Sequence, residues 1–319
     1  MEKRKRILVT AGGTATAWHL VNVAQAYYRN DVEIFVCDTN AKELVPAAHL
    51  AKGFFQVPLS YDSQYVSVLT KIIQENCVDV VVPLIPYEAM ILHPEATPIK
   101  ELMIKTAAPK LKTTEALADK VNLCRTLEGM DIPTPHVFGK NEISKTSKYI
   151  VKPRFGFGSV GIKILSGEEV LNGNFDFSKW AIQEYCHEED YDEVTVEVFN
   201  FEGYLKIFAR RRIATKAGVC VKMEPVNSKI FLPFIKKMTE SVECPVVFNV
   251  QFLFHQQEWK LFDCNLRLGA GTALSTAIGF QLTRALLAVL SGIHVDHSWF
   301  NVDYNVKKVL RVYQEIVVR

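Results

Sequence analysis

The sequence predicts an α/β domain with a doubly wound parallel sheet, followed by an α+β region made of two smaller units. Residues 5–95 alternate short apolar runs with stretches of helical periodicity, which is typical of a parallel sheet covered by helices. Residues 149–165 have the pattern of a strand, a glycine-rich turn and a second strand. Two further hairpin patterns follow, at residues 193–213 and 246–265, and they indicate an antiparallel sheet.

Length and composition limit the possible classes of protein. A chain of 319 residues is long for one hydrophobic core, so two or three units are expected. The 37 basic and 35 acidic residues leave a net charge of +2, which gives no electrostatic case for nucleic-acid binding. Seven scattered cysteines without a Cys-x-x-Cys pair fit a reducing cytoplasm, and they argue against a zinc site or a disulfide framework. No stretch is long enough to cross a membrane, so a cytoplasmic protein without membrane contact is expected.

The first unit begins with a buried strand at residues 7–9, and an amphipathic helix follows it. A second strand is expected at 33–37 and a second helix at 63–76. The continuous apolar run at 78–85 is typical of a central parallel strand. In a sheet of this kind, ligands bind at the carboxyl ends of the strands.

Polar residues and glycines at these strand ends allow more than one interpretation. Gly12-Gly13 with Asp38 suggests dinucleotide binding, but that fingerprint needs three spaced glycines and residues 15–17 supply none. A Gly-Gly turn between a strand and a helix is more often a packing requirement, and the turn could also lie near a ligand without binding a dinucleotide. Glu88 could face a ligand from the third strand end or simply begin a helix.

A small α+β unit is expected at about residues 113–185. It opens with a helix that ends at Gly129, and Pro133 and Pro135 then enforce an extended entry into the next strand.

The loop that begins at Lys152 carries the clearest chemical signal. Gly156, Gly158 and Gly161 leave several backbone amides free of side chains and permit positive φ where the loop folds over. Lys152 adds a compact positive charge. Such a loop suits the phosphates of a nucleotide, and a plain tight hairpin is the alternative.

The hairpin at 193–213 places polar side chains on one face. Glu193, Thr195 and Glu197 alternate with apolar residues, so they share a side of their strand. The returning strand carries three consecutive arginines, and Arg211 faces opposite to its neighbours. One or two of the three could therefore enter a site, although a solvated arginine run is the common alternative.

The hairpin at 246–265 brings oxygen-bearing side chains together. Gln251, Asp263 and Asn265 could converge from neighbouring strands, and such ligands suit Mg²⁺. Directly afterwards, Arg267 and a glycine-bearing turn lead into a predicted helix at 273–291. Backbone donors at a helix start beside an arginine form an anion site.

The end of the chain is simpler. The helix at 273–291 is expected to end at Gly292, and residues 306–318 are expected to form a closing strand.

Taken in chain order, these motifs resemble the ATP-grasp superfamily of carboxylate–amine and carboxylate–thiol ligases, in its carbamoyl phosphate synthetase-like branch. The motifs are Asp119-Lys120, Gly129-x-x-Ile132-Pro133-x-Pro135, Val151-Lys152-Pro153 with its glycine loop, Gln183-Glu184-Tyr185, the strand at 193–197, and Asp263-x-Asn265-x-Arg267. The resemblance covers essentially the whole chain. It implies a Rossmann-like pre-ATP-grasp domain at 1–112, an ATP-grasp lid subdomain with the glycine-rich loop at 113–185, and a C-terminal subdomain with a metal site at 186–319.

The resemblance also implies roles for individual residues. ATP would be contacted by Lys120, by Lys152 at the phosphates, by the loop residues Gly156, Gly158, Ser159 and Gly161, by the adenine hinge Glu184, Tyr185 and Cys186, and by Glu193 at the ribose. Mg²⁺ would be held by Asp263 and Asn265, with Gln251 as a further candidate. Arg267, together with Arg210 or Arg212, would stabilise the transferring phosphate or the substrate carboxylate.

The implied function is an ATP- and Mg²⁺-dependent ligase that activates a small carboxylate as an acyl phosphate and joins it to an amine, such as an amino acid or a small metabolite. The family usually has Glu-x-Asn-x-Arg where this chain has Asp263, which leaves room for altered activity. The alternative is therefore an ATP-binding regulatory or sensor protein without ligase turnover. The two substrates, the pathway and the oligomeric state do not follow from the sequence, although the first domain could offer a homodimer surface.

Overall fold

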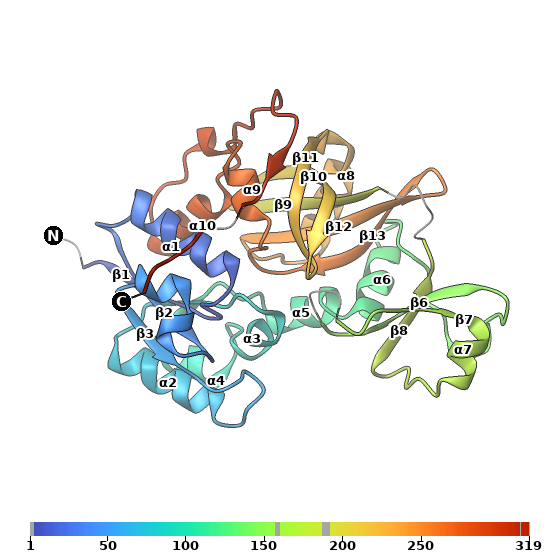
Figure 1. Cartoon of the computed structure of the whole chain (residues 1–319), viewed down its shortest axis with the longest axis horizontal. Helices are drawn as coiled ribbons and strands as arrows, with labels where there is room; N and C mark the ends of the chain where they lie inside the picture. The colour runs from blue at the N-terminus through green and yellow to red at the C-terminus, as the bar shows by residue number, and fades with distance from the viewer. Residues whose placement is uncertain (1–2, 157–159, 187–191, 313, 319) are drawn as a thin grey trace.

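The computed structural model describes residues 3–156, 160–186, 192–312 and 314–318, and it is organised around three β-sheets. In Figure 1 the sheet of the N-terminal residues and the three-stranded sheet lie at opposite ends of the long axis, and the six-stranded sheet lies above and between them. Gly158 and Ser159 of the predicted phosphate loop lie outside the described residues.

The first sheet has five parallel strands in the order β3-β2-β1-β4-β5, which confirms the predicted α/β class. Its strands are β1 (Lys5–Val9), β2 (Val32–Asp38), β3 (Gly53–Gln56), β4 (Val80–Val82) and β5 (Lys105–Thr106). The two edge strands β3 and β5 were not predicted, because they have only four and two residues. The apolar run at 78–85 is a strand only over β4, and Pro86 then opens a helix.

Helices α1 (Ala15–Tyr27), α2 (Tyr65–Glu75), α3 (Pro86–Ile91) and α4 (Thr97–Glu101) accompany this sheet. Helix α1 starts where the Thr14 side chain accepts a hydrogen bond from the backbone of Ala17 at 3.2 Å. The other side of α1 meets the C-terminal part of the chain, where the Tyr28 hydroxyl donates to the carbonyl of Arg284 at 3.0 Å. One buried cluster therefore runs from β1 through α1 to the last helix.

The central part of the chain forms a small antiparallel sheet in the order β7-β6-β8. Its elements are α5 (Leu111–Leu117), α6 (Lys120–Glu128), β6 (Lys148–Pro153), β7 (Lys163–Ser166), α7 (Gly167–Asn172) and β8 (Trp180–Glu184). Helix α6 ends at Gly129, as its sequence predicts.

The third sheet has six strands in the order β13-β12-β9-β10-β11-β14, and all the pairings are antiparallel. The strands are β9 (Glu193–Phe201), β10 (Tyr204–Lys216), β11 (Val219–Val226), β12 (Val247–His255), β13 (Glu258–Asn265) and β14 (Val309–Leu310). Helix α8 (Leu232–Ser241) packs on it through Ile235 and Met238. The antiparallel ATP-grasp-type arrangement expected for the second half of the chain is thus confirmed.

Two predictions for the C-terminal region are wrong. The expected single helix at 273–291 is interrupted, and the structure has α9 (Thr272–Thr276) and α10 (Leu282–Ser291) instead. Gly279 lies between them at φ +104, a conformation that only glycine adopts without strain, and it turns the chain against Asn301. Instead of the expected strand at 306–318, the described residues form only the short strand β14, in which Val309 and Leu310 pair with β11. The Arg311 amide adds one more hydrogen bond, to the Val221 carbonyl of β11 at 2.8 Å.

No helix within the described ranges is long and apolar enough to cross a membrane.

Candidate active site

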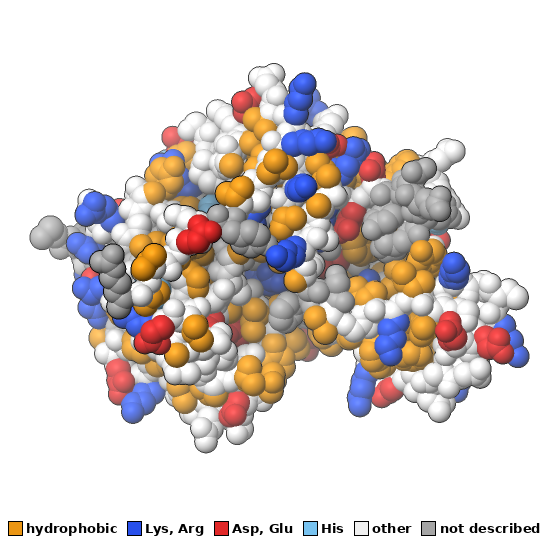
Figure 2. Space-filling model, in the orientation of Figure 1, with side chains coloured by type: hydrophobic (Ala, Val, Ile, Leu, Met, Phe, Trp, Pro, Cys, Tyr) orange, Lys and Arg blue, Asp and Glu red, His pale blue; other side chains and the backbone are white. Residues whose placement is uncertain are grey.

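A cavity of about 690 Å³ lies where the three sheets approach one another. Figure 2 shows Lys and Arg side chains in the recess at the centre of this face of the molecule. The predicted site residues that line the cavity are Lys120, Lys152, Gly156, Glu193, Arg210, Arg212, Gln251, Asp263, Asn265 and Arg267. The structure therefore brings together ten residues that are spread over about half of the sequence.

Lys152 enters the cavity from strand β6 and is almost fully buried, with 5% of its surface exposed. Its ammonium group lies 5.5 Å from the centre of the Phe262 ring and 3.5 Å from the Phe262 carbonyl oxygen. Burial lowers the pKa of Lys152 to about 8, and the nearby Lys120 adds to this effect while Asp263 opposes it. An anionic ligand would restore the charged form.

Lys120 is the first residue of helix α6, and its ammonium nitrogen lies 3.8 Å from a carboxylate oxygen of Asp263. The helix start is fixed by Asp119, whose carboxylate caps the first turn and accepts a hydrogen bond from Arg154 Nε at 2.7 Å. Arg154 directly follows β6, at the beginning of the glycine-rich loop, so this ion pair holds the first residues of the loop against α6. Lys120 is thereby oriented toward the cavity by two separate elements.

The three candidate metal ligands are adjacent on strands β12 and β13. Gln251 pairs directly with Asp263 in the sheet, and the Asn265 side-chain amide donates to Asp263 Oδ2 at 2.9 Å. The Gln251 amide, oriented to satisfy its neighbours, also donates to Asp263 at 3.2 Å and accepts from Arg212 at 2.5 Å. This set holds a single carboxylate beside two amide oxygens, which fits a Mg²⁺ ion that also keeps water and substrate phosphates as ligands.

The arginines of strand β10 divide between the two faces of the sheet, as their alternation predicts. Arg210 and Arg212 point into the cavity, where they pair with Glu197 (Nε–Oε1, 3.4 Å) and with Glu193. Arg211 points to the other side, where it is paired with Asp192 and Glu224. Burial raises the pKa of Glu193, although Arg212 opposes that shift.

Several buried donors in the cavity lack partners within the described part of the chain. They are Arg210 Nη1, Arg212 Nε and Arg267 Nε. Burial also lowers the pKa of Arg267 to about 10. Buried polar atoms in proteins are nearly always hydrogen-bonded, so these three donors indicate an acceptor-rich ligand.

Other predicted residues do not line this cavity. Gly161 is not itself a lining residue, although its neighbours Val160 and Ile162 are. Glu184 and Tyr185 line a separate recess of about 330 Å³ together with His255. Cys186, two residues after Glu184, is buried. Their predicted contacts with adenine are contacts of the backbone and remain predictions.

Sequence reasoning missed some of the lining. Phe262 and Asn249 reach the cavity from β13 and β12, and Gly271 fits against Arg210 so closely that a Cβ there would lie 1.9 Å from the guanidinium. Nothing in the sequence marks Phe262, whereas Asn249 shares a strand face with Gln251, and Gly271 belongs to the glycine-bearing turn that the sequence predicts as an anion site. Residues 14–16 line the cavity from the start of α1, next to the Gly-Gly turn that the sequence places near a possible ligand.

Glu88 is buried in α3 and accepts hydrogen bonds from the hydroxyls of Thr10 and Tyr65. It does not line the large cavity. Burial raises its pKa, so its environment favours the neutral acid. Of the two interpretations of Glu88, the helix-start position is the one that the structure has.

Comparison with known proteins agrees with this geometry. A family model described as the PylC-like N-terminal domain matches residues 7–107, and a model of the ATP-grasp domain matches residues 117–271. No curated protein matches the chain by sequence.

Among solved structures, the biotin carboxylase domain of Hydrogenobacter thermophilus 2-oxoglutarate carboxylase, a dimer in complex with MgADP, ADP and bicarbonate, superposes with a TM-score of 0.78. It is 13% identical, and the match covers 95% of this chain and 73% of the other. Staphylococcus aureus N5-carboxyaminoimidazole synthetase complexed with ADP has a TM-score of 0.73 at 15% identity, covering 93% of this chain and 79% of the other. Biotin carboxylase from Campylobacter jejuni has a TM-score of 0.74 at 12% identity, and the match covers 96% of this chain and 74% of the other. At these identities the likeness is one of fold.

Proposed function

Because the chain is an ATP-grasp protein with a PylC-like N-terminal domain, we propose that it is an ATP- and Mg²⁺-dependent ligase that activates a small carboxylate and joins it to an amine. The observation that carries the proposal is the cavity in which, among the described residues, two lysines and three arginines face only two acids, Glu193, which pairs with Arg212, and Asp263, which lies 3.8 Å from Lys120. Three buried guanidinium donors there have no partner within the described residues, which is the arrangement that a polyphosphate and a carboxylate would complete.

The proposed roles of the lining residues follow from their positions in the cavity, and those of Glu184, Tyr185 and Cys186 are the ones that the ATP-grasp resemblance implies. Lys152 and Lys120 would contact the phosphates from the side of the three-stranded sheet, and the loop that begins at Gly156 would cover them. Mg²⁺ would be held by Asp263 and Asn265, with Gln251 beside them. The carbonyl and amide groups of Glu184, Tyr185 and Cys186 would contact adenine, and Glu193 would contact the ribose.

The chemistry needs charge and positioning rather than an activated nucleophile. When bound, Mg-ATP supplies the phosphoryl group that converts a carboxylate into an acyl phosphate, from which an amine then displaces phosphate. The protein's own contribution is to hold the two anions together and to offset their charge. Arg267 lies between β13 and α9 and would hold the carboxylate, and Arg210 and Arg212 line the same cavity.

A narrower recess of about 170 Å³ adjoins the cavity and suggests where the rest of the substrate would lie. Its wall is largely apolar, with Pro86, Met90 and Leu266, and it shares Asp263 and Arg267 with the main cavity. A carboxylate held at Arg267 would therefore extend an uncharged part into this recess. A small metabolite or amino acid with an apolar side chain fits this description.

The competing function is an ATP-binding sensor without turnover, and one observation favours it. The candidate metal site has only one carboxylate, because Gln251 is neutral and Asp263 is shorter than the glutamate that the family usually has. Bridging two metal ions is correspondingly harder. A homodimer built on the first domain is compatible with either function.

One experiment separates the two functions. Phosphate release is measured with Mg-ATP and pools of amino acids and small carboxylates, and a ligase is expected to release phosphate with at least one pool. The Lys152→Ala variant should lose both this release and the rise in melting temperature that Mg-ATP causes. The matched control is Lys145→Ala, which removes an exposed lysine of the same small sheet region and should change neither.

The outcomes are distinct. Saturable ATP binding without phosphate release across all pools would contradict the ligase and leave the sensor. A wild-type protein whose melting temperature is indifferent to Mg-ATP would contradict both.

A further inference from the structure

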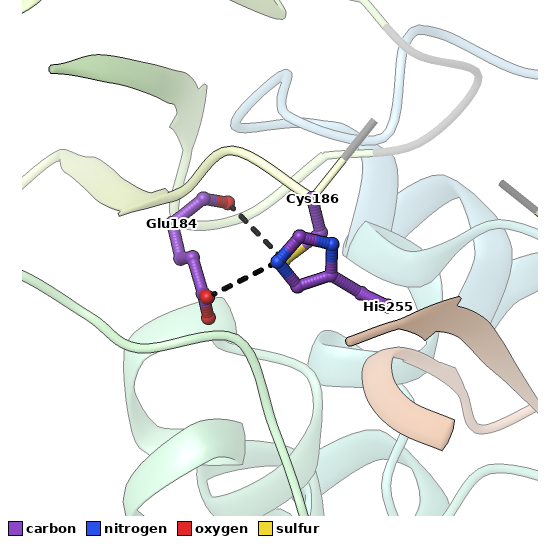
Figure 3. A group of neighbouring side chains, drawn as sticks. All are labelled: Glu184, Cys186 and His255. Atoms are coloured by element: carbon purple, nitrogen blue, oxygen red, sulfur yellow. Dashed lines mark hydrogen bonds and ion pairs between the residues drawn. The ribbon is translucent and has the colours of Figure 1, made fainter. Parts of the chain in front are cut away.

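A second cluster of chemically reactive side chains lies outside the cavity. Figure 3 shows Glu184, Cys186 and His255 directed toward one another. One potential ligand atom from each lies within 4.8 Å of the others. Cys186 and His255 are buried, with 1% and 6% of their surfaces exposed, and Glu184 is half-buried.

Two different sheets contribute these residues. Glu184 is the last residue of β8 in the three-stranded sheet, and Cys186 follows it in the next turn. His255 is the last residue of β12 in the six-stranded sheet. The cluster therefore exists only where the ends of the two sheets meet, and no sequence motif marks it.

The spacing suits a small tetrahedral ion. Zinc bonds of about 2.0–2.3 Å to nitrogen, oxygen and sulfur in a tetrahedron place the ligand atoms roughly 3.3–3.7 Å apart. Glu184 Oε1 and His255 Nε2 are 3.5 Å apart, within this range. The Cys186 sulfur contacts the Glu184 carbonyl oxygen at 3.7 Å, and it lies within 4.8 Å of the other two ligand atoms.

The carboxylate is already oriented by groups behind it. Its other oxygen, Oε2, accepts from the Lys260 ammonium at 2.6 Å and from the backbone amide of His136 at 3.2 Å. Oε1 is thereby left facing His255. Hydrogen bonds of this kind orient ligating carboxylates in metal sites. The thiolate and the carboxylate would balance the two charges of the zinc ion, so the Lys260 ammonium would add one positive charge beside the site.

We propose that Glu184, Cys186 and His255 form a zinc site with three protein ligands and a fourth position open to water. A thiolate, an imidazole and a carboxylate form a donor set that selects zinc over Mg²⁺ or Ca²⁺. The bound ion would tie the three-stranded sheet to the six-stranded sheet at the turn after β8. This site is separate from the Asp263 site, and its existence does not depend on the ligase proposal.

The test is direct zinc binding by the full-length protein. Chelator-stripped protein is titrated with Zn²⁺ in competition with a chromophoric chelator, and one equivalent is expected to bind. Cys186→Ser and His255→Gln should each weaken binding at least tenfold. The matched controls are Cys77→Ser and His49→Gln, which change an exposed cysteine and an exposed histidine and should bind like the wild type.

A second measurement identifies the ligands. Co²⁺ in the same site should give intense visible bands of a tetrahedral complex and a thiolate charge-transfer band in the near ultraviolet, and Cys186→Ser should lose the latter. Melting curves without metal check that each variant is folded, and Glu184→Gln replaces any variant that is not. The proposal is overturned if the wild type fails to bind zinc, if the ligand variants bind like the controls, or if the cobalt complex lacks the thiolate band.

Discussion

Arg210 and Glu197 form an ion pair at the centre of the six-stranded sheet, with Nε and Oε1 3.4 Å apart and only 4% and 1% of the two residues exposed. Glu197 also accepts a hydrogen bond from the hydroxyl of Ser275 in α9. The pair therefore connects strands β9 and β10 to the C-terminal helices, while Nη1 of Arg210 has no hydrogen-bond partner among the residues that the structure describes.

Removing Arg210 should destabilise the fold. Arg210→Ala leaves the buried carboxylate of Glu197 without its counter-ion, which typically costs about 3–5 kcal/mol. Arg211→Ala on the same strand is the matched control, because Arg211 is 41% exposed and its removal should cost about 1 kcal/mol or less. Urea unfolding curves give both values. If both variants lose the same free energy of unfolding, the buried Arg210–Glu197 ion pair contributes no more to stability than the exposed Arg211 does.

Lys152 should make stability depend on pH. Its pKa is about 8 in the folded protein and about 10.5 in the unfolded chain, so between these values the unfolded chain holds a proton that the folded protein lacks. The free energy of unfolding therefore rises with pH over this window, by about 3 kcal/mol relative to a variant without the lysine.

The comparison is between the wild type and Lys152→Met, which keeps the side-chain volume, with unfolding measured at several pH values from 8 to 10.5. Lys145→Met serves as the control for an exposed lysine. Parallel curves for the wild type and Lys152→Met would show that Lys152 is charged in the folded protein throughout.

Asp263 should couple nucleotide binding to Mg²⁺. Asp263→Ala removes the only carboxylate among the three candidate ligands, so added Mg²⁺ should no longer increase the melting-temperature shift that ATP causes. ATP without metal should still bind, because the positive charge of Lys120 and Lys152 is then less neutralised. Asp263→Glu should keep the metal dependence, and Asp176→Ala, an exposed change, should have no effect. Metal dependence that survives in Asp263→Ala would place the ion elsewhere.

Gly279 should tolerate no side chain. It lies at φ +104, and a Cβ there would be 2.2 Å from the Asn301 carbonyl oxygen, so Gly279→Ala should cost about 2–4 kcal/mol. Gly203→Ala measures the cost of positive φ alone, because Gly203 has φ +78 and no atom lies within 4 Å of the added carbon. This substitution should lower the free energy of unfolding by about 1–2 kcal/mol. Thermal unfolding of both variants provides the test. If both variants are destabilised by the same amount, the clash with the Asn301 carbonyl is relieved by a local shift that costs no free energy.

The sequence by itself determined the parts that depend on local pattern. Alternating strands and helices predicted the parallel first sheet, and the order of motifs from Asp119 to Arg267 predicted an ATP-grasp fold. Period-two alternation also assigned Arg210 and Arg212 to one face and Arg211 to the other. Each of these follows from residues that are close in the chain, where backbone geometry fixes which side chains are neighbours.

Only the tertiary structure decided which distant residues meet. The break in the C-terminal helix depends on Asn301 approaching Gly279, and the shortness of β14 depends on where the edge of β11 lies. The absence of a Cys-x-x-Cys pair argued against a zinc site, yet Cys186 and His255 meet at the ends of two sheets. Such contacts carry no local signature, because they arise from packing between elements that lie far apart in the sequence.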